Sequence, residues 1–157
     1  MSGIYTVPFS FTGADGTMDL CALVAHSSKQ CALLGFEIGQ ISDVGDAAEE
    51  IIAISVHSGF TVAGSGGSAV TPSPLDPVGA PASGFTARMA DTTPAGTGTA
   101  TAHYEYTWNI RQALNVTYPP EWQIVFGAGR RVCISLSVAA PADSLTTRGY
   151  AVVQEIG

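Results

Sequence analysis

The residues best suited to hold a metal ion form one acidic group. Asp43, Asp46, Glu49 and Glu50 lie close together in the sequence, and calcium prefers several oxygen ligands from one flexible loop. Their spacing differs from that of an EF-hand, in which acidic or amide residues alternate before a glycine and a distal glutamate. We therefore interpret the group as a solvated connector, with a helical turn capped by Asp43 or Asp46, and keep ion binding as the alternative.

Residues for acid–base or nucleophilic catalysis are scattered. His26, His57 and His103 lie in different segments, with no cysteine or carboxylate at a spacing typical of a ligand pair. A Ser–His–Asp arrangement stays open because triads assemble in space, although no G-x-S-x-G elbow is present. The glycine-rich segment 64–68 lacks the Lys-Ser/Thr ending of a phosphate-binding loop. The sequence predicts outward histidines, a surface loop at 64–68, and no catalytic, metal or cofactor site.

Aromatic residues offer a second kind of chemistry, the stacking of sugar rings. Tyr104, Tyr106 and Trp108 alternate with polar residues, so they could form a sugar-binding platform on one face of a strand. The regular alternation favours a position in the core instead. Trp122 follows a pair of prolines and is the better candidate for an exposed aromatic side chain.

Two adjacent arginines, Arg130 and Arg131, follow a glycine at an expected hairpin. Neighbouring residues of a strand point to opposite faces, so at most one of them would reach a given partner. They could pair with an acidic patch on a neighbouring subunit, or they could be ordinary solvent-exposed hairpin charges.

The composition argues against binding to nucleic acid or to anionic membranes. The chain has 157 residues, a net charge of −7 and only 12% charged residues, while 46% are hydrophobic. Clustered lysine and arginine side chains bind nucleic acid and anionic membranes, so neither is an expected partner. Ordinary soluble domains carry about 25% charged residues. The thinly charged surface therefore indicates that part of it is covered in an assembly.

The cysteines and the first residues of the chain indicate the cellular compartment in which the protein is made. Cys21, Cys31 and Cys133 are an odd number without CxxC spacing, so neither a disulfide scaffold nor a zinc ribbon is expected. They are interpreted as small apolar residues of a protein made in a reducing cytoplasm. The segment 1–11 has no basic start and no long apolar run, so no secretory signal is expected.

Alternating hydrophobic residues predict a β-sheet framework. In 31–41, Leu34, Phe36 and Ile38 share one face, and in 51–58 Ile52, Ile54 and Val56 alternate with Ala53, Ser55 and His57 in the same way. In 5–11, Tyr5, Val7, Phe9 and Phe11 alternate with polar residues and Pro8, which also predicts a strand. Further strands are expected at 20–25, 85–90, 99–108, 122–126, 132–138 and 147–156. We also expect extended structure in 109–117.

Two segments are expected to reach beyond this framework. Pro8 places 1–12 at a sheet edge or in an arm lying on a neighbour, because proline cannot donate to a ladder. Segment 59–84, rich in Gly, Ser and Pro, is interpreted as a long loop that contacts another molecule.

The expected fold is a single all-β domain over 1–157. Eight to ten short strands separated by turns, without a convincing long helix, favour an antiparallel β-sandwich, most simply a jelly roll. An immunoglobulin-like sandwich is the alternative, but the chain exceeds the usual ~100 residues and lacks the Cys, Trp, Cys series.

Three phrases of the sequence resemble small virion proteins of tailed bacteriophages and prophages. They are Ile41–Glu50, Pro72–Pro77, and Pro141–Leu145 before the end of the chain. The resemblance implies a jelly-roll capsid decoration (cement) protein, often a homotrimer. Such a protein would be made in the host bacterial cytoplasm, sit on the head surface of the virion and bind the major capsid protein. The resemblance implies no catalytic residue.

A non-enzymatic structural role is therefore the leading hypothesis. A tail, head-fibre or host-contact position is the first alternative, and a carbohydrate-binding module or sandwich-fold hydrolase is the second. The residues expected to contact a partner lie in the N-terminal strand, the proline-rich excursion and the later hairpin: Tyr5, Pro8, Pro72, Pro74, Leu75, Asp76, Pro77, Trp122, Arg130 and Arg131.

Overall fold

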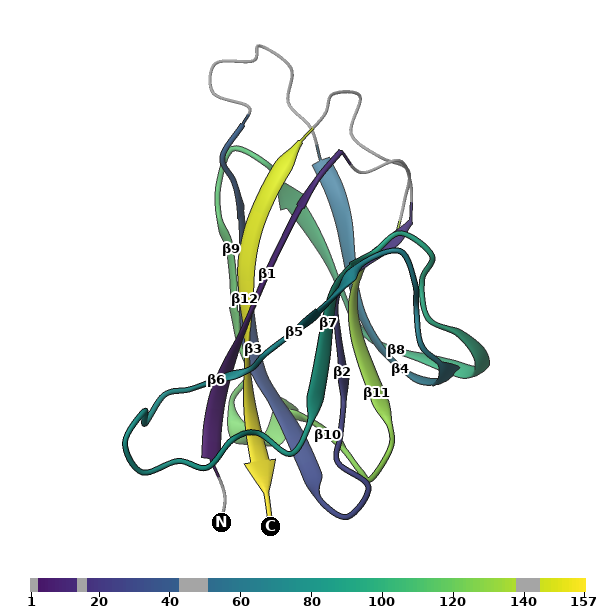
Figure 1. Cartoon of the computed structure of the whole chain (residues 1–157). Coiled ribbons are helices and arrows are strands. Elements are labelled where there is room, and N and C mark those ends of the chain that lie inside the picture. The colour runs from purple at the N-terminus through teal and green to yellow at the C-terminus, as the bar shows by residue number, and fades with distance from the viewer. Residues whose placement is uncertain (1–2, 14–16, 43–50, 138–144) are drawn as a thin grey trace.

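A computed structural model describes residues 3–13, 17–42, 51–137 and 145–157. These residues form twelve strands and one 3-10 turn, η1 (Pro120–Trp122). Every pairing between strands is antiparallel, and the strands divide into two sheets. The predicted antiparallel sandwich is confirmed, and both ends of the drawn chain lie at the same end of it (Figure 1).

The first sheet contains six strands. In spatial order they are β10 (Ile124–Phe126), β3 (Gln30–Gln40), β12 (Thr146–Ile156), β1 (Gly3–Thr12) and β6 (Ser73–Pro74), with β9 (Leu114–Thr117) also paired to β3. β12 pairs along its length with β3 on one side and β1 on the other, so it forms the centre of this sheet.

The second sheet also contains six strands. In spatial order they are β5 (Ser68–Val70), β7 (Thr86–Asp91), β2 (Met18–Val24), β11 (Arg131–Leu136), β4 (Ile51–Val62) and β8 (Gly96–Asn109). The two strands predicted at 31–41 and 51–58 therefore lie in different sheets, with β3 in the first and β4 in the second.

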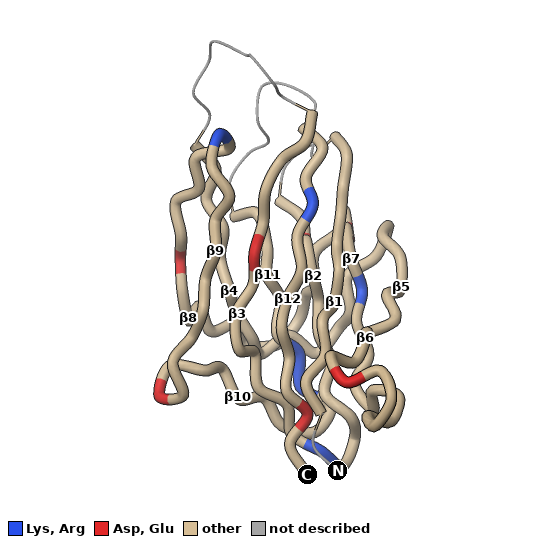
Figure 2. The backbone as a smooth tube through the Cα atoms, turned by 90° about the vertical axis from the view of Figure 1, so that its left-hand side faces the viewer, with Lys and Arg blue, Asp and Glu red and all other residues tan. Residues whose placement is uncertain are grey.

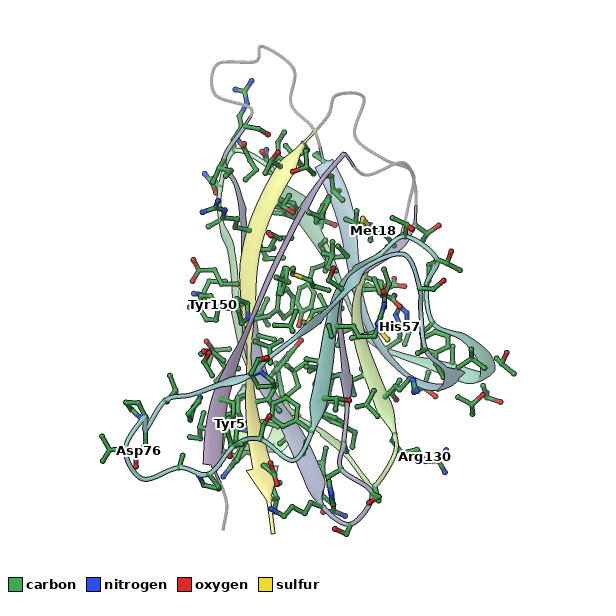
Figure 3. The ribbon with its side chains drawn as sticks, in the orientation of Figure 1. Tyr5, Met18, His57, Asp76, Arg130 and Tyr150 are labelled. Atoms are coloured by element: carbon green, nitrogen blue, oxygen red, sulfur yellow. The ribbon has the colours of Figure 1, made fainter. Side chains whose placement is uncertain are left out.

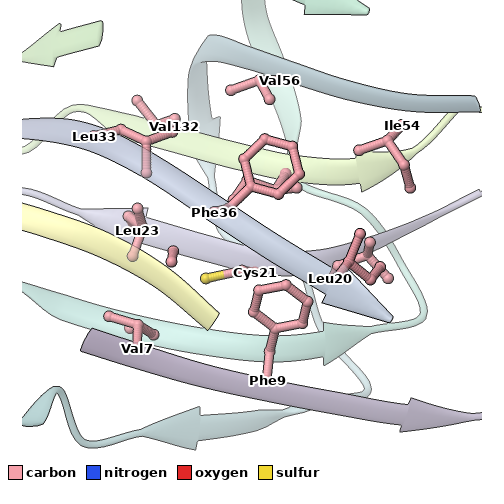
Figure 4. Close-up of a cluster of buried hydrophobic side chains, with 14 of the residues drawn as sticks. Val7, Phe9, Leu20, Cys21, Leu23, Leu33, Phe36, Ile54, Val56 and Val132 are labelled. Atoms are coloured by element: carbon pink, nitrogen blue, oxygen red, sulfur yellow. The ribbon is translucent and has the colours of Figure 1, made fainter. Parts of the chain in front are cut away.

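The core lies between the two sheets. Val7 and Phe9 of β1 and Phe36 of β3 approach Leu23 of β2 and Ile54 of β4 from the opposite layer (Figure 4). All five side chains are buried, and the alternation predicted for β1 is confirmed, with Val7 and Phe9 inward and Pro8 exposed.

A β-bulge in β3 changes the predicted alternation. Val152 of β12 pairs with Gly35 and Val153 with Leu33, so Leu34 is an extra residue in the ladder. Leu33 is buried in the core in place of Leu34, whereas Phe36 and Ile38 point inward as predicted. The expectation that Leu34 shares a face with Phe36 is wrong because the inserted residue reverses the alternation before it.

The sequence interpretation of 59–84 as a loop without strands is corrected in part. β4 continues to Val62, and the segment then contributes β5 and β6. These pieces raise the number of strands above the predicted eight to ten, and β4 and β8 are long, with 12 and 14 residues. The remaining connection between β6 and β7 is the loop at the centre of the candidate contact surface.

The long β4–β8 ribbon depends on a glycine. Gly59 has φ +101°, and a Cβ there would lie 2.0 Å from the carbonyl oxygen of Thr99 on β8. The register shifts between Ser58 and Phe60 at this point. Only glycine allows both this backbone conformation and this approach between the strands.

Aromatic residues close one side of the sandwich. Trp108 is buried as predicted, whereas Tyr104 and Tyr106 are half-buried and pack against the core. Tyr104 stacks on Tyr118 with ring centroids 4.9 Å apart, and the Tyr106 hydroxyl donates to that of Tyr118 at 3.0 Å. Burial and this hydrogen bond raise the pKa of Tyr118. These aromatics link β8 to the segment before β10.

Candidate contact surface

Hydrogen bonds within the loop and to β1 hold the loop between β6 and β7 in shape. The Oδ1 of Asp76 accepts hydrogen bonds from the backbone N–H groups of Val78 at 3.1 Å and Gly79 at 3.0 Å. The N–H of Ala80 donates to the carbonyl of Asp76 at 3.2 Å, and the N–H of Leu75 donates to the carbonyl of Ile4 at 2.9 Å. An aspartate that binds the backbone of the following residues is a typical turn device, so this loop has a defined conformation.

The loop carries apolar side chains at its outermost point. Val78 is 96% exposed and Leu75 is 60% exposed, and Pro77 between them is also exposed. We call Leu75, Pro77 and Val78 the apolar tip. Figure 3 shows Asp76 at the far end of the loop, well outside the body of the sandwich. Large apolar side chains exposed together on an ordered loop are the kind of surface that another protein chain can cover.

Tyr5 and Pro72 correct the predicted set of contact residues. Tyr5 is only 1% exposed, its ring meets Phe85 edge-on at 5.5 Å, and its hydroxyl donates to the carbonyl of Pro81 at 3.1 Å. Pro72 is also buried. Both were expected at the surface, but both are buried, and the excursion folds back onto β1 so that Pro81 and Phe85 contact Tyr5. They support the base of the loop.

A buried carboxylate fastens the far end of the same loop. Glu155 of β12 is 1% exposed and accepts hydrogen bonds from Lys29 Nζ at 2.6 Å and from the N–H of Gly84 at 2.8 Å. Burial alone would raise the pKa of Glu155, but these two donors outweigh it and hold the pKa below its ordinary value. The loop is therefore tied both to β1 and to the last strand.

A groove follows the free edge of β1. β1 pairs with β6 only at Tyr5 and Thr6, and beyond them a groove of about 540 Å³ separates β1 from β5. Its lining combines apolar side chains with one cation: Pro8, Phe9, Ser10, Ala69, Val70, Thr71, Met89, Arg148 and Gly149. Arg148 is exposed and has no acidic partner among the described residues.

The predicted contact residues do not form one patch. Pro74 is half-buried in β6, whereas Pro8 and Trp122 are exposed, Trp122 by 63%. Asp76 and Arg130 lie on opposite sides of the sandwich (Figure 3). Arg130 is exposed and Arg131 is half-buried, which agrees with the prediction that at most one arginine of this pair faces a given partner.

A polar cluster that the sequence did not single out crosses three strands of the second sheet. Ser135 of β11 donates to Asp19 Oδ1 of β2 at 2.5 Å, and Asp19 Oδ2 accepts from the N–H of Ala95 at 2.7 Å. His57 of β4 has Nε2 at 3.4 Å from Ser135 Oγ and Nδ1 at 3.2 Å from Ser55 Oγ. Burial lowers the pKa of His57, against the attraction of Asp19. Figure 3 shows His57 beside β11.

This cluster has the residue types of a catalytic triad in a different order. In a triad the histidine accepts the serine proton and is oriented by the aspartate. Here Ser135 lies between the other two and donates directly to Asp19, and Ser135 and Asp19 are only 3% and 1% exposed. The arrangement holds the connection before β8 against the sheet, and a substrate has no access to the serine oxygen.

Other chemistry on the described residues is sparse. No three His, Cys, Asp or Glu side chains of the described part gather in a group that could hold a metal ion, and the predicted acidic connector at 43–50 lies outside it. Cys21, Cys31 and Cys133 are free and buried, as small apolar residues would be. Figure 2, turned toward the β3, β12 and β1 sheet, shows how few charged residues line these strands.

No helix among the described residues is long and apolar enough to cross a membrane. The chain matches no protein-family model, no curated protein and no solved structure.

Proposed function

We propose that this chain is a non-enzymatic structural protein of a tailed-bacteriophage particle, which binds the outside of the head and stabilises contacts between major capsid subunits. The observation that carries the proposal is the exposure of large apolar side chains on ordered parts of the fold. Val78 is 96% exposed at the apolar tip, on a loop fastened by hydrogen bonds, and Val125 is 56% exposed on the first sheet. A decoration protein needs such a preformed contact, since ordering a flexible loop on binding would reduce its affinity.

The strand order supports a jelly roll as the framework. One sheet holds β10, β3, β12 and β1, and the other holds β2, β11, β4 and β8. Successive strands of this set cross between the sheets, apart from the neighbours β4 and β8. This is the pattern expected of two Greek keys wound into eight strands. β5, β6 and β7 are then an insertion between β4 and β8, and this insertion contains the apolar tip.

The low charge agrees with a protein that works in an assembly. The interface core of protein complexes is depleted in charged residues and enriched in apolar ones. Several further apolar side chains are exposed on the first sheet, including Ile4 on β1, Val125 on β10 and Ile156 on β12. They widen the area that a neighbouring capsid subunit could cover.

Reconstitution on heads of the parent phage that lack this protein tests the proposal. The purified chain should bind these heads, raise their melting temperature and appear on their outer surface by cryo-electron microscopy. Val125→Asp on β10 should weaken binding because it buries a charge in the contact with the head. Val62→Asp is the matched control, since Val62 is 53% exposed at the end of β4, away from the tip.

Localisation to the tail alone, or absence from purified particles, would refute the proposal. A tail, head-fibre or host-contact protein is the alternative that the first result would favour. Exposed Trp122 beside Glu121 is the feature that would serve a carbohydrate-binding module. Glycan binding that is lost in Trp122→Ala would favour that alternative.

A further inference from the structure

We propose that copies of this chain assemble head to tail, with the apolar tip of one copy seated in the groove beside β1 of the next. This inference deepens the proposed function by naming the contact through which the copies join. The tip contributes Leu75, Pro77 and Val78, and the groove contributes the apolar surface between β1 and β5.

The two surfaces match in their chemistry. The tip presents exposed apolar side chains on an ordered loop, and the groove offers about 540 Å³ lined by exposed Pro8 and by half-buried Val70 and Met89. Seating the tip would remove apolar area from water on both partners, which is the main favourable term in association.

The charges match as well. Asp76 uses Oδ1 to hold its own turn, while its Oδ2 has no hydrogen-bond partner among the described residues. Arg148 at the rim of the groove also has no acidic partner in the described part. An arginine–carboxylate pair across the contact would fix the orientation of the tip, as charged pairs do in other interfaces.

One copy cannot make this contact with itself. Thr71 lines the groove and Leu75 begins the tip, and β6 connects them by pairing with Tyr5 and Thr6 of β1. β6 runs antiparallel to β1, away from Pro8 and toward Ile4, so it leads the chain out of the groove. The tip and the groove are therefore fixed at opposite ends of β6.

The groove is better suited to side chains than to an added strand. The carbonyl of Ile4 points toward β6 because it accepts from Leu75, and backbone direction alternates along a strand. Pro8 and Ser10 therefore turn their backbone to the same free edge, where Pro8 has no N–H to donate. A proline at an edge blunts strand addition, which leaves the apolar side chains as the binding surface.

Because tip and groove are different surfaces, the contact is heterologous, and such contacts form a ring when the rotation closes. Sedimentation equilibrium and native mass spectrometry of the purified chain should show a concentration-dependent closed oligomer, whose mass gives the number of copies.

Variants on each side of the contact give a sharper result. Val78→Asp on the tip and Arg148→Glu at the rim of the groove should each weaken self-association by about tenfold or more. The first places a charge in the apolar contact, and the second brings a carboxylate against Asp76. An equimolar mixture of the two should form a dimer and no ring, because only one intact tip and one intact groove remain. Val62→Asp, the same charge change elsewhere, should assemble like the wild type, and circular dichroism confirms that all variants fold.

A monomeric wild type at its highest soluble concentration would overturn the inference, as would two variants that assemble normally or a mixture that regains the full ring. These failures differ from failure of the proposed function. A monomer that still binds heads leaves the decoration role intact, whereas a ring that ignores heads supports the contact and removes that role.

Discussion

Removal of the Asp19 carboxylate tests whether the polar cluster of the second sheet is structural. Asp19 is 1% exposed and accepts hydrogen bonds from Ser135 Oγ and from the N–H of Ala95. A hydrogen bond to a charged group contributes about 1.5–3 kcal/mol, and a buried donor without a partner costs about 1–3 kcal/mol. The desolvation of the carboxylate is lost at the same time, so Asp19→Ala should destabilise the fold by about 3 kcal/mol rather than by the sum.

Urea unfolding at neutral pH measures this effect. With a slope of about 1–3 kcal/mol per molar urea, Asp19→Ala should lower the midpoint by about 1–3 M. Asp19→Asn should lose less, because its amide oxygen can still accept from Ala95 while the Ser135 hydroxyl turns to accept from the amide. Glu105→Ala on the exposed face of β8 is the control and should change stability by about 0.5 kcal/mol or less. If Asp19→Ala costs less than about 1 kcal/mol, the cluster does not hold the connection before β8.

Three further predictions concern other parts of the fold. The pKa of Glu155 is lowered, so its ionised form stabilises the native state above the ordinary value of 4.5 and this contribution is lost as the pH falls through the native pKa. Glu155→Gln should therefore be less stable than the wild type at pH 7, and pH-dependent unfolding should show the gap narrowing in acid; a constant gap would contradict the role of Lys29. Gly59→Ala should lower the unfolding free energy by about 1–3 kcal/mol because it places a Cβ against β8 at positive φ, whereas an unchanged melting temperature would show that the ribbon can adjust. Burial raises the pKa of the Cys31 thiol to about 11, so a thiol reagent at pH 8 should label the cysteines only after denaturation, and rapid labelling of the native chain would refute their burial.

The strands were predictable where one face of a sheet is simply buried. β1 follows a period of two without interruption, so Val7, Phe9 and Phe11 were assigned inward correctly. The same period failed at Leu34 because the sequence gives no sign of the bulge that arises from pairing with β12. A pattern within one strand cannot specify an irregularity that its neighbour creates.

The contact residues were predictable only in part. Composition indicated that the proline-rich segment leaves the sheet framework, and the apolar tip lies within it. Tyr5 shares the inward face of β1 with Val7 and Phe9, and the excursion, which is distant in sequence, covers its hydroxyl end. The burial of Pro72 could not be read from its residue type. The cluster around Asp19 was missed for a related reason, since its members come from β2, β4 and β11 and meet only through sheet order.

Three carboxylates of the chain share one role in the fold. Asp19, Asp91 and Glu155 are at most 1% exposed, and each accepts a hydrogen bond from the backbone N–H of a residue in a connecting segment. These donors are Ala95, Gly67 and Gly84, respectively. Charge-assisted hydrogen bonds to backbone donors are stronger than neutral ones. Buried carboxylates thus fasten the segments around β5, β6 and β7 to the sheets, which leaves an ordered excursion with apolar side chains at its outer end.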